Sequence, residues 1–548
     1  MSSSEAAHRV AETQVVIVGA GPVGLTLALD LGRRGVPCLL IERNETSIQL
    51  PKMERCNART MEIYRRLGIA EQVRDAGLPR DAPMDVFLAL SMAGPVLAHL
   101  PYPSVAQAKA EIAARNDGGL LEPYQIISQY TLEPLLRSIV EKLPSVTVRF
   151  GCELISLEQD ADTVRAVVQP LGGAPYTVRA SYLVGCDGGS SAVRKHLGIR
   201  LEGDGNIRKL RQALFHCDDL YGRIPIGKGR HYHIAEGPLF PFLILQDSAR
   251  HWTVHAAASS DAEMAEIFKR SLGMPIPFEM LSVNEWTQHL LCAERYGDGR
   301  VFIAGDAAHL VIPTGGLGMN TGVGDAVDLS WKLAATLAGW GGPQLLASYD
   351  AERRPIGVRN VKASGAAMTG RLGWRAAYRP NIAEDTPEGT AARTRMATLF
   401  DTEQRKVTEI SGIEAGYRYV DSPIMWAESG DRPDPDNPGY VPTTWPGARL
   451  PHVWLKDGSA LHDHLGPNYT LLSLGATHSS TASLQECFRD LRAPLDVLEI
   501  ADQKAREIYD CDLLLVRPDL HVAWRGNKLP EDAARLALIA TGRFSMRR

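Results

Sequence analysis

The chain has 548 residues, of which 45% are hydrophobic and 22% charged, and its formal net charge is -5. This composition fits a globular protein of several domains, and the lack of a basic excess argues against nucleic acid or an anionic membrane as a partner. The first residues, MSSSEAAHRVAET, contain no apolar run of the kind found in secretory signals. Eight scattered cysteines without a CxxC motif indicate reduced thiols, no structural zinc and a cytoplasmic location.

Residues 14–42 predict a strand, a turn, a helix and a second strand. Strands over 14–18 and 37–41 flank the turn GAGPVG and a helix over 25–34. In that turn Gly19 permits the tight bend, Gly21 lets a pyrophosphate approach the backbone, and Gly24 lets the helix pack on the sheet. Glu42 ends the second strand, where a carboxylate can accept hydrogen bonds from a ribose. The segment predicts a dinucleotide-binding site.

The next segments predict helices and more strands around this unit. Helices are expected over 60–67 and 132–143, antiparallel strands over 146–169 and a buried strand over 182–185. The buried strand ends in GCDGG, which places Asp187 at a second turn. Taken alone, this aspartate is as well explained by a hydrogen-bonded turn as by a ligand contact.

Residues 206–293 have a different sequence pattern, in which short strand-like runs alternate with residues typical of turns. We expect a separate sheet inserted into the nucleotide domain. On its strand 231–235, His231 and His233 share one face and Tyr232 takes the other. These side chains, with His216 and Tyr221 nearby in sequence, are candidates for substrate contact.

The sequence RVFIAGDAAHLVIPTGGLGMNTGVGDAVDLSWK carries the most information. A buried strand ends at Asp306, a turn with Pro313, Gly316 and Gly318 follows, and a long helix begins at Met319 and Asn320. A carboxylate facing a glycine-rich helix N-terminus can hold a polyhydroxyl chain, with negative charge on the exposed backbone amides. Two such sites converging on one long ligand indicate a dinucleotide, and FAD fits best.

Helical patterns continue over 319–340 and 344–370, and the Pro-, Asp- and Gly-rich segment 431–447 predicts a linker without regular elements. Beyond the linker, strands over 468–474, 495–500, 513–517 and 521–524 surround a helix over 481–491. These elements predict a small α/β appendage.

Three motifs together, GAGPVG with Glu42, GCDGG, and GDAAHLVIPTGGLGMNTGVGDAVDLSWKLA, resemble the class A FAD-dependent aromatic hydroxylases. The tail, GARLPHVWLKDG to LVRPDLHVAWRG, resembles the thioredoxin-like C-terminal domain of the phenol hydroxylase, hydroxyphenylpropionate hydroxylase and polyketide hydroxylase branches. The implied fold class is α/β, with a Rossmann-like FAD domain (12–80, 128–205, 294–372), an inserted mixed β-sheet substrate domain (81–127, 206–293), a helical segment and linker (373–447) and a thioredoxin-like domain (448–548).

The resemblance implies a role for each matching residue. The ADP half of FAD would contact Gly19, Gly21, Pro22, Gly24, Glu42 and Arg43, and Gln129 would approach the pyrophosphate. Asp187 would serve FAD and a passing nicotinamide, Asp306 the ribityl chain, and Pro313, Gly316, Gly318, Met319 and Asn320 the flavin edge. Many relatives read Pro-Arg-Ala where this chain has Lys52, which keeps the charge but loses the planar fork, and many carry arginine where Ser190 stands.

The implied reaction uses NAD(P)H as a transient co-substrate, because the chain carries a single dinucleotide fingerprint. Reduced FAD would meet O2, and the flavin C4a-hydroperoxide would transfer one oxygen to a small aromatic substrate. Glu54 is the candidate base for ionising a phenol, with His216, Tyr232 and His233 as further catalytic candidates. A homodimer through the C-terminal appendage stays open.

Other uses of the same site also stay open. They include a polyketide-tailoring hydroxylation or Baeyer–Villiger step, a flavin reductase that does not oxygenate, and a flavin-binding sensor. Halogenation is disfavoured because the Trp-x-Trp-x-Ile-Pro pattern is absent from the sequence.

Overall fold

The computed structural model describes residues 10–237, 240–431, 433–434, 436–474 and 481–544. The fold is mixed α/β with several sheets, and the largest hydrophobic core lies around a six-stranded sheet. No helix in this described part of the chain has the length and apolar character that crossing a membrane requires.

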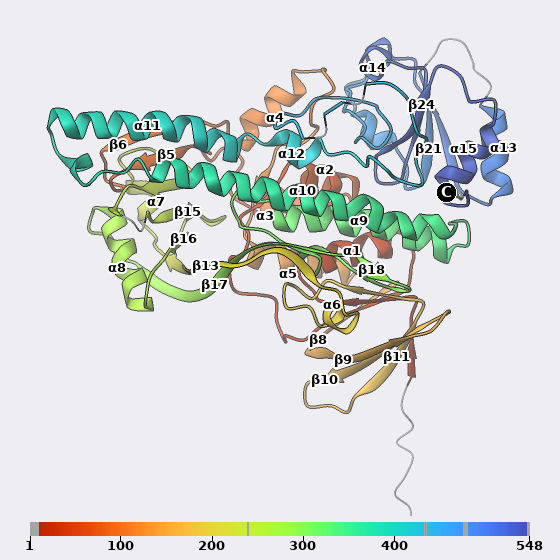
Figure 1. The fold of residues 1–548 in the computed structure, drawn as a ribbon, viewed down its shortest axis with the longest axis horizontal. Helices are drawn as coiled ribbons and strands as arrows, with labels where there is room; N and C mark the ends of the chain where they lie inside the picture. The colour runs from red at the N-terminus through yellow and green to blue at the C-terminus, as the bar shows by residue number, and fades with distance from the viewer. Residues whose placement is uncertain (1–9, 238–239, 432, 435, 475–480, 545–548) are drawn as a thin grey trace, which may run out of the picture.

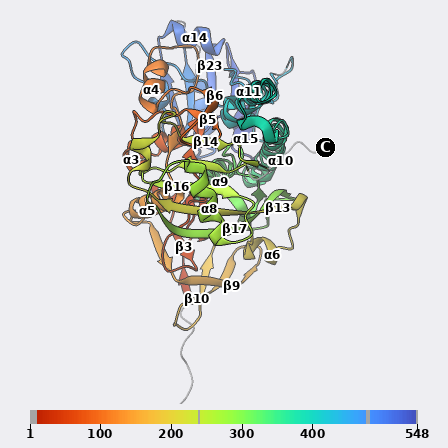
Figure 2. The same cartoon turned by 90° about the vertical axis from the view of Figure 1, so that its left-hand side faces the viewer.

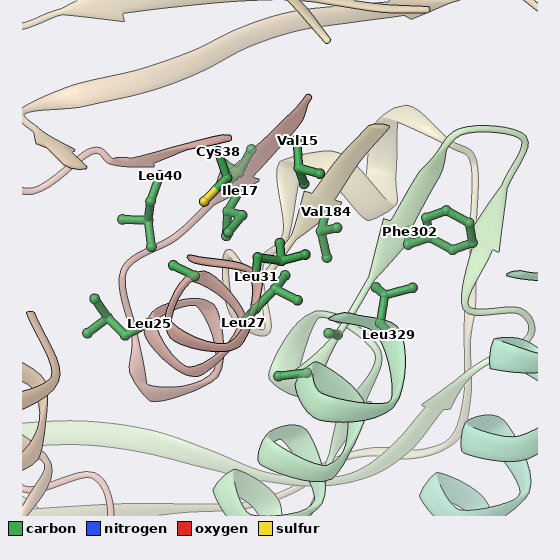
Figure 3. Close-up of a cluster of buried hydrophobic side chains, with 14 of the residues drawn as sticks. Val15, Ile17, Leu25, Leu27, Leu31, Cys38, Leu40, Val184, Phe302 and Leu329 are labelled. Carbon is green, nitrogen blue, oxygen red and sulfur yellow. The ribbon is translucent and has the colours of Figure 1, made fainter. Parts of the chain in front are cut away.

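The six-stranded sheet has the order β18-β19-β12-β2-β3-β8 and is parallel except for β18. Its strands are Gly297–Asp298, Val301–Ile303, Tyr182–Gly185, Val15–Val18, Cys38–Glu42 and Val146–Phe150, in that spatial order. Helices α1 (Pro22–Arg33) and α9 (Gly318–Leu337) pack together beside it. Figure 3 shows Leu27 and Leu31 of α1 and Leu329 of α9 close to Ile17 and Val184 of the strands. This packing brings the starts of both helices to the carboxyl ends of the parallel strands.

The eight-stranded sheet has the order β20-β17-β13-β16-β15-β14-β5-β6. Its two long strands, β13 and β17, pair along most of their length. The β14–β5 pairing is parallel and joins the later strands to a hairpin from the first hundred residues. In spatial order the strands are His309–Leu310, Glu279–Ala293, Leu201–His216, His251–Ala256, Phe242–Leu245, His231–Ile234, Val86–Ala89 and Val96–Leu100.

Two long helices run antiparallel across the molecule. Helix α10 (Pro343–Arg375) packs on α9 and β17, and α11 (Pro387–Thr408) returns beside α10 (Figure 1). The C-terminal end of α10 and the adjoining α11 cover the β5–β6 side of the eight-stranded sheet. The core between them contains Trp374 and Phe400. This arrangement puts side chains of α10 against the inner face of that sheet.

The C-terminal part forms a four-stranded sheet of order β22-β21-β23-β24, which lies at the opposite end of the molecule from β9–β11 (Figure 2). The strands are Leu495–Glu499, Tyr469–Ser473, Leu513–Val516 and Val522–Gly526, with helices α13 (Ala482–Asp490), α14 (Gln503–Tyr509) and α15 (Ala533–Ala540). Arg517, at the end of β23, forms buried ion pairs with Asp328 of α9 at 2.9 Å and Glu352 of α10 at 2.6 Å. Lys332 of α9 bonds both carboxylates as well. The C-terminal sheet is therefore joined to the central helices by a buried charge cluster.

Smaller elements complete the chain. A second four-stranded sheet, β1-β11-β10-β9, uses Val10–Glu12, Tyr176–Ala180, Val164–Pro170 and Cys152–Gln159, and β4 (Arg55–Cys56) pairs with β7 (Gln125–Ile126). The other α-helices are α2 (Ala58–Arg66), α3 (Ala70–Ala76), α4 (Val105–Ala113), α5 (Gln129–Val140), α6 (Ala192–His196), α7 (Leu220–Arg223), α8 (Asp261–Leu272) and α12 (Ser411–Ala415). Short 3-10 turns are η2 (Gly305–Ala307), η3 (Pro380–Ala383) and η4 (Leu461–His464).

The structure differs from the sequence expectation in three places. The run predicted as antiparallel over 146–169 is split, because β8 joins the parallel sheet beside β3 and only β9 and β10 pair antiparallel. The strand expected at 213–217 is the end of the much longer β13. Strand β17 was not predicted, because its partly exposed, mixed sequence gives no buried apolar run.

Candidate functional site

The first glycine-rich turn is shaped by close contacts that no side chain could share. Gly19 has a φ of +104°, and a Cβ there would lie 2.4 Å from the Cys186 carbonyl oxygen. A Cβ on Gly24 would lie 2.0 Å from the Gly19 oxygen, so this glycine lets α1 start directly against the turn. At Gly21 the nearest atom to an added Cβ is 3.9 Å away, on the side chain of Glu133. The turn is tight where the protein packs and open where a ligand would approach.

The N-terminus of α1 faces this open side. Pro22 opens the helix, and its N-cap, Gly21, has no side chain to satisfy the first amides. At the end of β3, Glu42 accepts hydrogen bonds from the amides of Ala20 (2.9 Å) and Asn44 (2.9 Å). Arg43 is exposed beside it on the same cavity wall. The helix dipole and the fixed carboxylate suit a phosphate and a ribose, respectively.

Gln129, at the start of α5, donates a hydrogen bond to Glu133 at 2.6 Å. Glu133 also accepts one from the Ile48 amide, and burial raises its pKa. Both residues line the cavity near Gly21. Glu133 was missed from the sequence, and its only signal was its position one helical turn after Gln129.

Asp187 lies at the end of β12, where its carboxylate accepts hydrogen bonds from the Ser191 hydroxyl and the Ala192 amide, each at 2.6 Å. It therefore stabilises the turn into α6. It also lines the cavity, so the structural role does not remove it from the ligand site.

Asp306 lies in η2, directly after β19, and its side chain is exposed to the cavity. Burial raises its pKa, while His309 and Lys52 lower it. Lys52 is itself exposed on the cavity wall, on a segment that reaches over from the loop after β3. These two residues place one negative and one positive group at the middle of the cavity.

The start of α9 is the second open helix N-terminus. Its N-cap, Leu317, provides no side-chain cap, and Gly316 precedes it with a φ of +64°. The Asn320 side chain is fully engaged: its oxygen accepts from the Asn57 amide (2.8 Å) and its nitrogen donates to the Gly316 carbonyl (2.7 Å). The Asn320 side chain thus fixes the turn, and the backbone of this first turn faces the cavity. Pro313, Gly318 and Met319 complete this wall of the cavity.

Both turns open into one cavity of about 960 Å³. It extends from the Gly19 turn past Asp306 and Asn320 to the inner face of the eight-stranded sheet. An elongated dinucleotide fits the first part, because two open helix N-termini and the carboxylates of Glu42 and Asp306 lie along it. The second part, next to the eight-stranded sheet, is left free for another ligand.

In this second part Glu54 accepts a hydrogen bond from His231 Nε2, which lies 3.0 Å from each carboxylate oxygen. Burial by itself would raise the pKa of Glu54, but His231, Arg230 and Arg55 lower it to about 2. Burial lowers the pKa of His231 to about 4, against the opposing effect of Glu54. Because both pKa values lie well below 7, the pair at neutral pH is a carboxylate beside a neutral imidazole.

The structure does not bring the other three catalytic candidates to the cavity. His216 lies at the surface end of β13, 3.4 Å from Asp218. Tyr232 points to the opposite face of the sheet, where its hydroxyl donates to the Gly227 carbonyl. His233 is buried and stacks on Phe242. None of the three lines the cavity. His216 lies at the surface, Tyr232 points to the other face of the sheet, and His233 is covered by Trp374 and Phe400.

Sequence reasoning missed several residues that line the second part of the cavity. Burial lowers the pKa of His255 to about 4, and its ring packs edge-on against Trp286. Arg371 and Arg375 come from the last turns of α10. These side chains converge from three distant segments, so no local motif marks them.

The fold and this site define a dinucleotide-binding α/β protein with an adjoining substrate cavity. A family model described as an FAD binding domain matches residues 12–364, and one described as the C-terminal region of aromatic-ring hydroxylases matches residues 443–544.

Relatives of known activity match over nearly the whole chain. The FAD-dependent monooxygenase apdD of Emericella nidulans is 33% identical over 96% of this chain and 90% of its own. The 2,4-dichlorophenol 6-monooxygenase of Cupriavidus pinatubonensis is 31% identical over 95% of each. The structure of the rebeccamycin biosynthetic enzyme RebC with reduced flavin superposes with a TM-score of 0.89 at 33% identity, covering 98% of this chain and 100% of that one.

The chain therefore belongs to the FAD-dependent aromatic-ring hydroxylases, a family of flavoprotein monooxygenases. FAD is its cofactor, as the residues predicted.

Proposed function

We propose that the protein hydroxylates a phenolic or related aromatic compound, with NAD(P)H as the reductant and O2 as the oxygen donor. The observation that carries this proposal is the single cavity, in which the FAD-binding turns lead directly to an aromatic-lined chamber. Phe240, Phe242 and Trp286 line that chamber. Aromatic and apolar walls suit a flat ring and exclude water from the reacting atoms. A monooxygenase of a dichlorophenol among the relatives supports the same substrate class.

We also propose the domain arrangement that the sequence suggested. Segments around the six-stranded sheet would form a Rossmann-like FAD domain, and the eight-stranded sheet the substrate domain. The four-stranded C-terminal sheet with its helices would form a thioredoxin-like domain. The mixing of early and late strands in the eight-stranded sheet supports an inserted domain.

When bound, FAD supplies hydride acceptance from NAD(P)H and the activation of O2. The protein's contribution begins with holding it: α1 and Glu42 at one end, Asp306 in the middle, and the first turn of α9 at the other. The positive end of α9 would favour negative charge on the part of the cofactor next to it.

The Glu54–His231 pair is placed to act on a substrate hydroxyl. Glu54 is ionised and faces the chamber, so it can accept the hydroxyl proton in a hydrogen bond. His231 orients the carboxylate from behind, with its ring held edge-on against Phe242. The arginines around the pair favour a phenolate over a phenol by their charge. The atom that we assign as the hydrogen-bond acceptor for the substrate hydroxyl is a carboxylate oxygen of Glu54.

The function is tested by offering phenols to the holoenzyme with NAD(P)H and oxygen-18 gas. We expect at least one phenol to stimulate NAD(P)H oxidation and to gain one labelled oxygen atom. If NAD(P)H is consumed at the same rate with every aromatic compound, or if no product carries the label, the hydroxylase proposal is wrong.

The role of Glu54 is tested by Glu54→Gln. Because the amide cannot accept the hydroxyl proton, we expect product formed per NAD(P)H to fall by roughly 10²-fold or more, and the remaining rate to rise at high pH as the phenol ionises unaided. Glu158→Gln, at an exposed position of β9 outside the cavity lining, is the control. An unchanged pH profile in Glu54→Gln would remove this residue from the mechanism.

A further inference from the structure

The substrate chamber contains more positive charge than the protein neutralises. Arg230, at the start of β14, is 2% exposed, and its Nε and Nη1 have no hydrogen-bond partner. Arg371 and Arg375, one helical turn apart on α10, each have an unpartnered Nε. All three line the cavity. Among the residues that the structure describes, no carboxylate lies within 4.0 Å of these guanidinium groups.

Their neighbours are mainly aromatic rings. The Arg371 guanidinium lies 4.8 Å from the Phe242 ring centre, and that of Arg230 5.2 Å from the Tyr124 ring centre. Arg375 donates a long hydrogen bond of 3.4 Å to the Phe240 carbonyl and lies over the Trp374 ring. Ring faces attract cations, but less strongly than a carboxylate does.

The lack of partners and the burial lower the pKa values of two of these arginines. Burial lowers the pKa of Arg371 to about 10, and burial together with the neighbouring Arg371 lowers that of Arg375 to about 9. Two acids lie near these arginines, Glu54, whose carboxylate is already bonded to His231, and Glu414. Arg55, the other arginine near Glu54, has its own partner in Glu414 at 2.7 Å. Buried cations without partners are costly, and an anionic ligand would remove that cost.

We propose that the substrate is an aromatic compound that carries a carboxylate, and that Arg371, Arg375 and Arg230 bind this carboxylate while Glu54, oriented by His231, faces its hydroxyl group. This inference rests on the proposed function and names its substrate class. The guanidinium fork matches a carboxylate in two parallel hydrogen bonds, and the rings of Phe242 and Trp286 hold the arene between the two ends.

The arginines are not placed for the cofactor's phosphates. The Gly19 turn lies at the start of α1, beside the six-stranded sheet. The C-terminal end of α10, which carries Arg371 and Arg375, lies instead near β5 of the eight-stranded sheet (Figure 1). A phosphate on the nicotinamide co-substrate is the other anion of similar chemistry. It is distinguished below by comparing NADH with NADPH.

The test compares acids with their neutral amides. Hydroxybenzoate with hydroxybenzamide, and hydroxynaphthoate with hydroxynaphthamide, are titrated into the oxidised holoenzyme, and binding is followed by the change in the flavin absorption spectrum. We expect each acid to bind more tightly than its amide. Arg371→Gln and Arg375→Gln should weaken acid binding roughly 10- to 100-fold, because each loses a hydrogen bond to a charged group, and should leave amide binding nearly unchanged.

Lys362→Gln is the matched control, since it removes a positive charge from the exposed side of the same helix. Equal binding of acids and amides, no spectral response to any of the four compounds, or an equal loss in Lys362→Gln would overturn the proposal. An effect on the KM for NADPH but not NADH, with acid binding intact, would also overturn it and assign the arginines to the co-substrate.

The two proposals fail separately. If the acids bind through the arginines but no compound gains oxygen, the hydroxylase function is wrong and the anion site stands. If amides and simple phenols are hydroxylated as well as the acids, the function stands and the carboxylate inference is wrong.

Discussion

Asp306 and Glu54 are carboxylates on the wall of one cavity, yet their surroundings shift their pKa values in opposite directions. Burial raises that of Asp306, whereas His231, Arg230 and Arg55 outweigh burial and lower that of Glu54 to about 2. A carboxyl group with a raised pKa suits hydrogen bonding to neutral hydroxyl groups, and one with a lowered pKa stays ionised beside a substrate. The two residues are therefore suited to different partners.

Asp306→Ala should lose bound flavin. The variant removes the one carboxylate in the middle of the cofactor part of the cavity, and we expect the Kd for FAD to rise roughly 10- to 100-fold. The ratio of flavin to protein absorbance after purification measures this. Asp162→Ala, in the exposed loop between β9 and β10, is the control. Fully yellow Asp306→Ala protein would contradict the assignment.

The Glu54–His231 pair also predicts an acid-sensitive stability. The folded state lowers the pKa of His231 from 6.5 to about 4, so its contribution is full above pH 6.5 and is lost as the pH falls toward 4. Other buried histidines act with the same sign, so the wild-type Tm should fall on acidification. In His231→Gln the loss between pH 6.5 and 4 should be smaller, by at most about 3 kcal/mol. Thermal unfolding at both pH values checks this, and parallel curves for the two proteins would disprove it.

At the scale of elements, local signals predicted the strand–turn–helix units that line the first part of the cavity. The buried runs of β2, β3, β12 and β19 and the glycines between them appear in consecutive residues, so each strand–turn–helix unit could be read directly. The substrate chamber could not be predicted in the same way. His231 and His255 are brought together by the pairing of β14, β15 and β16, Glu54 joins them through its hydrogen bond with His231, and Arg371 is added by α10 packing on β17. Those contacts depend on tertiary packing rather than on sequence spacing.

Gly24→Ala tests the close approach of α1 to its turn. The added methyl group would lie 2.0 Å from the Gly19 oxygen, which is backbone and has no room to move. We expect α1 to shift, FAD to be lost and the Tm to fall. Gly373→Ala is the matched control, because an added Cβ there meets no atom within 4 Å. A Gly24→Ala protein with normal flavin content would show that the turn is more adaptable than its geometry implies.

At the scale of the whole molecule, buried charges join the C-terminal sheet to the central helices. Arg517 bonds Asp328, Glu352 and Asp519, and its side chain is fully buried. A second buried pair, Arg449 with Glu62, joins the start of the C-terminal region to α2. Such pairs add little when complete but are costly to break, because the remaining charge has no partner.

Arg517→Met should therefore destabilise the protein by about 3–5 kcal/mol. Arg525→Met, which breaks a half-exposed pair with Glu428, should cost about 1 kcal/mol or less. Denaturant unfolding of both variants measures the difference. Equal losses would show that the cluster around Arg517 does not hold the C-terminal sheet in place.

Helix α9 begins at the wall of the proposed cofactor cavity and carries Asp328 and Lys332 further along. A chimera that took its C-terminal region from another hydroxylase would change the groups that meet this helix. A domain exchange between these enzymes therefore has to transfer α9 and α10 together with the C-terminal region that they contact. Otherwise the changed ion pairs would shift α9 and, with it, the turn that lines the cofactor part of the cavity.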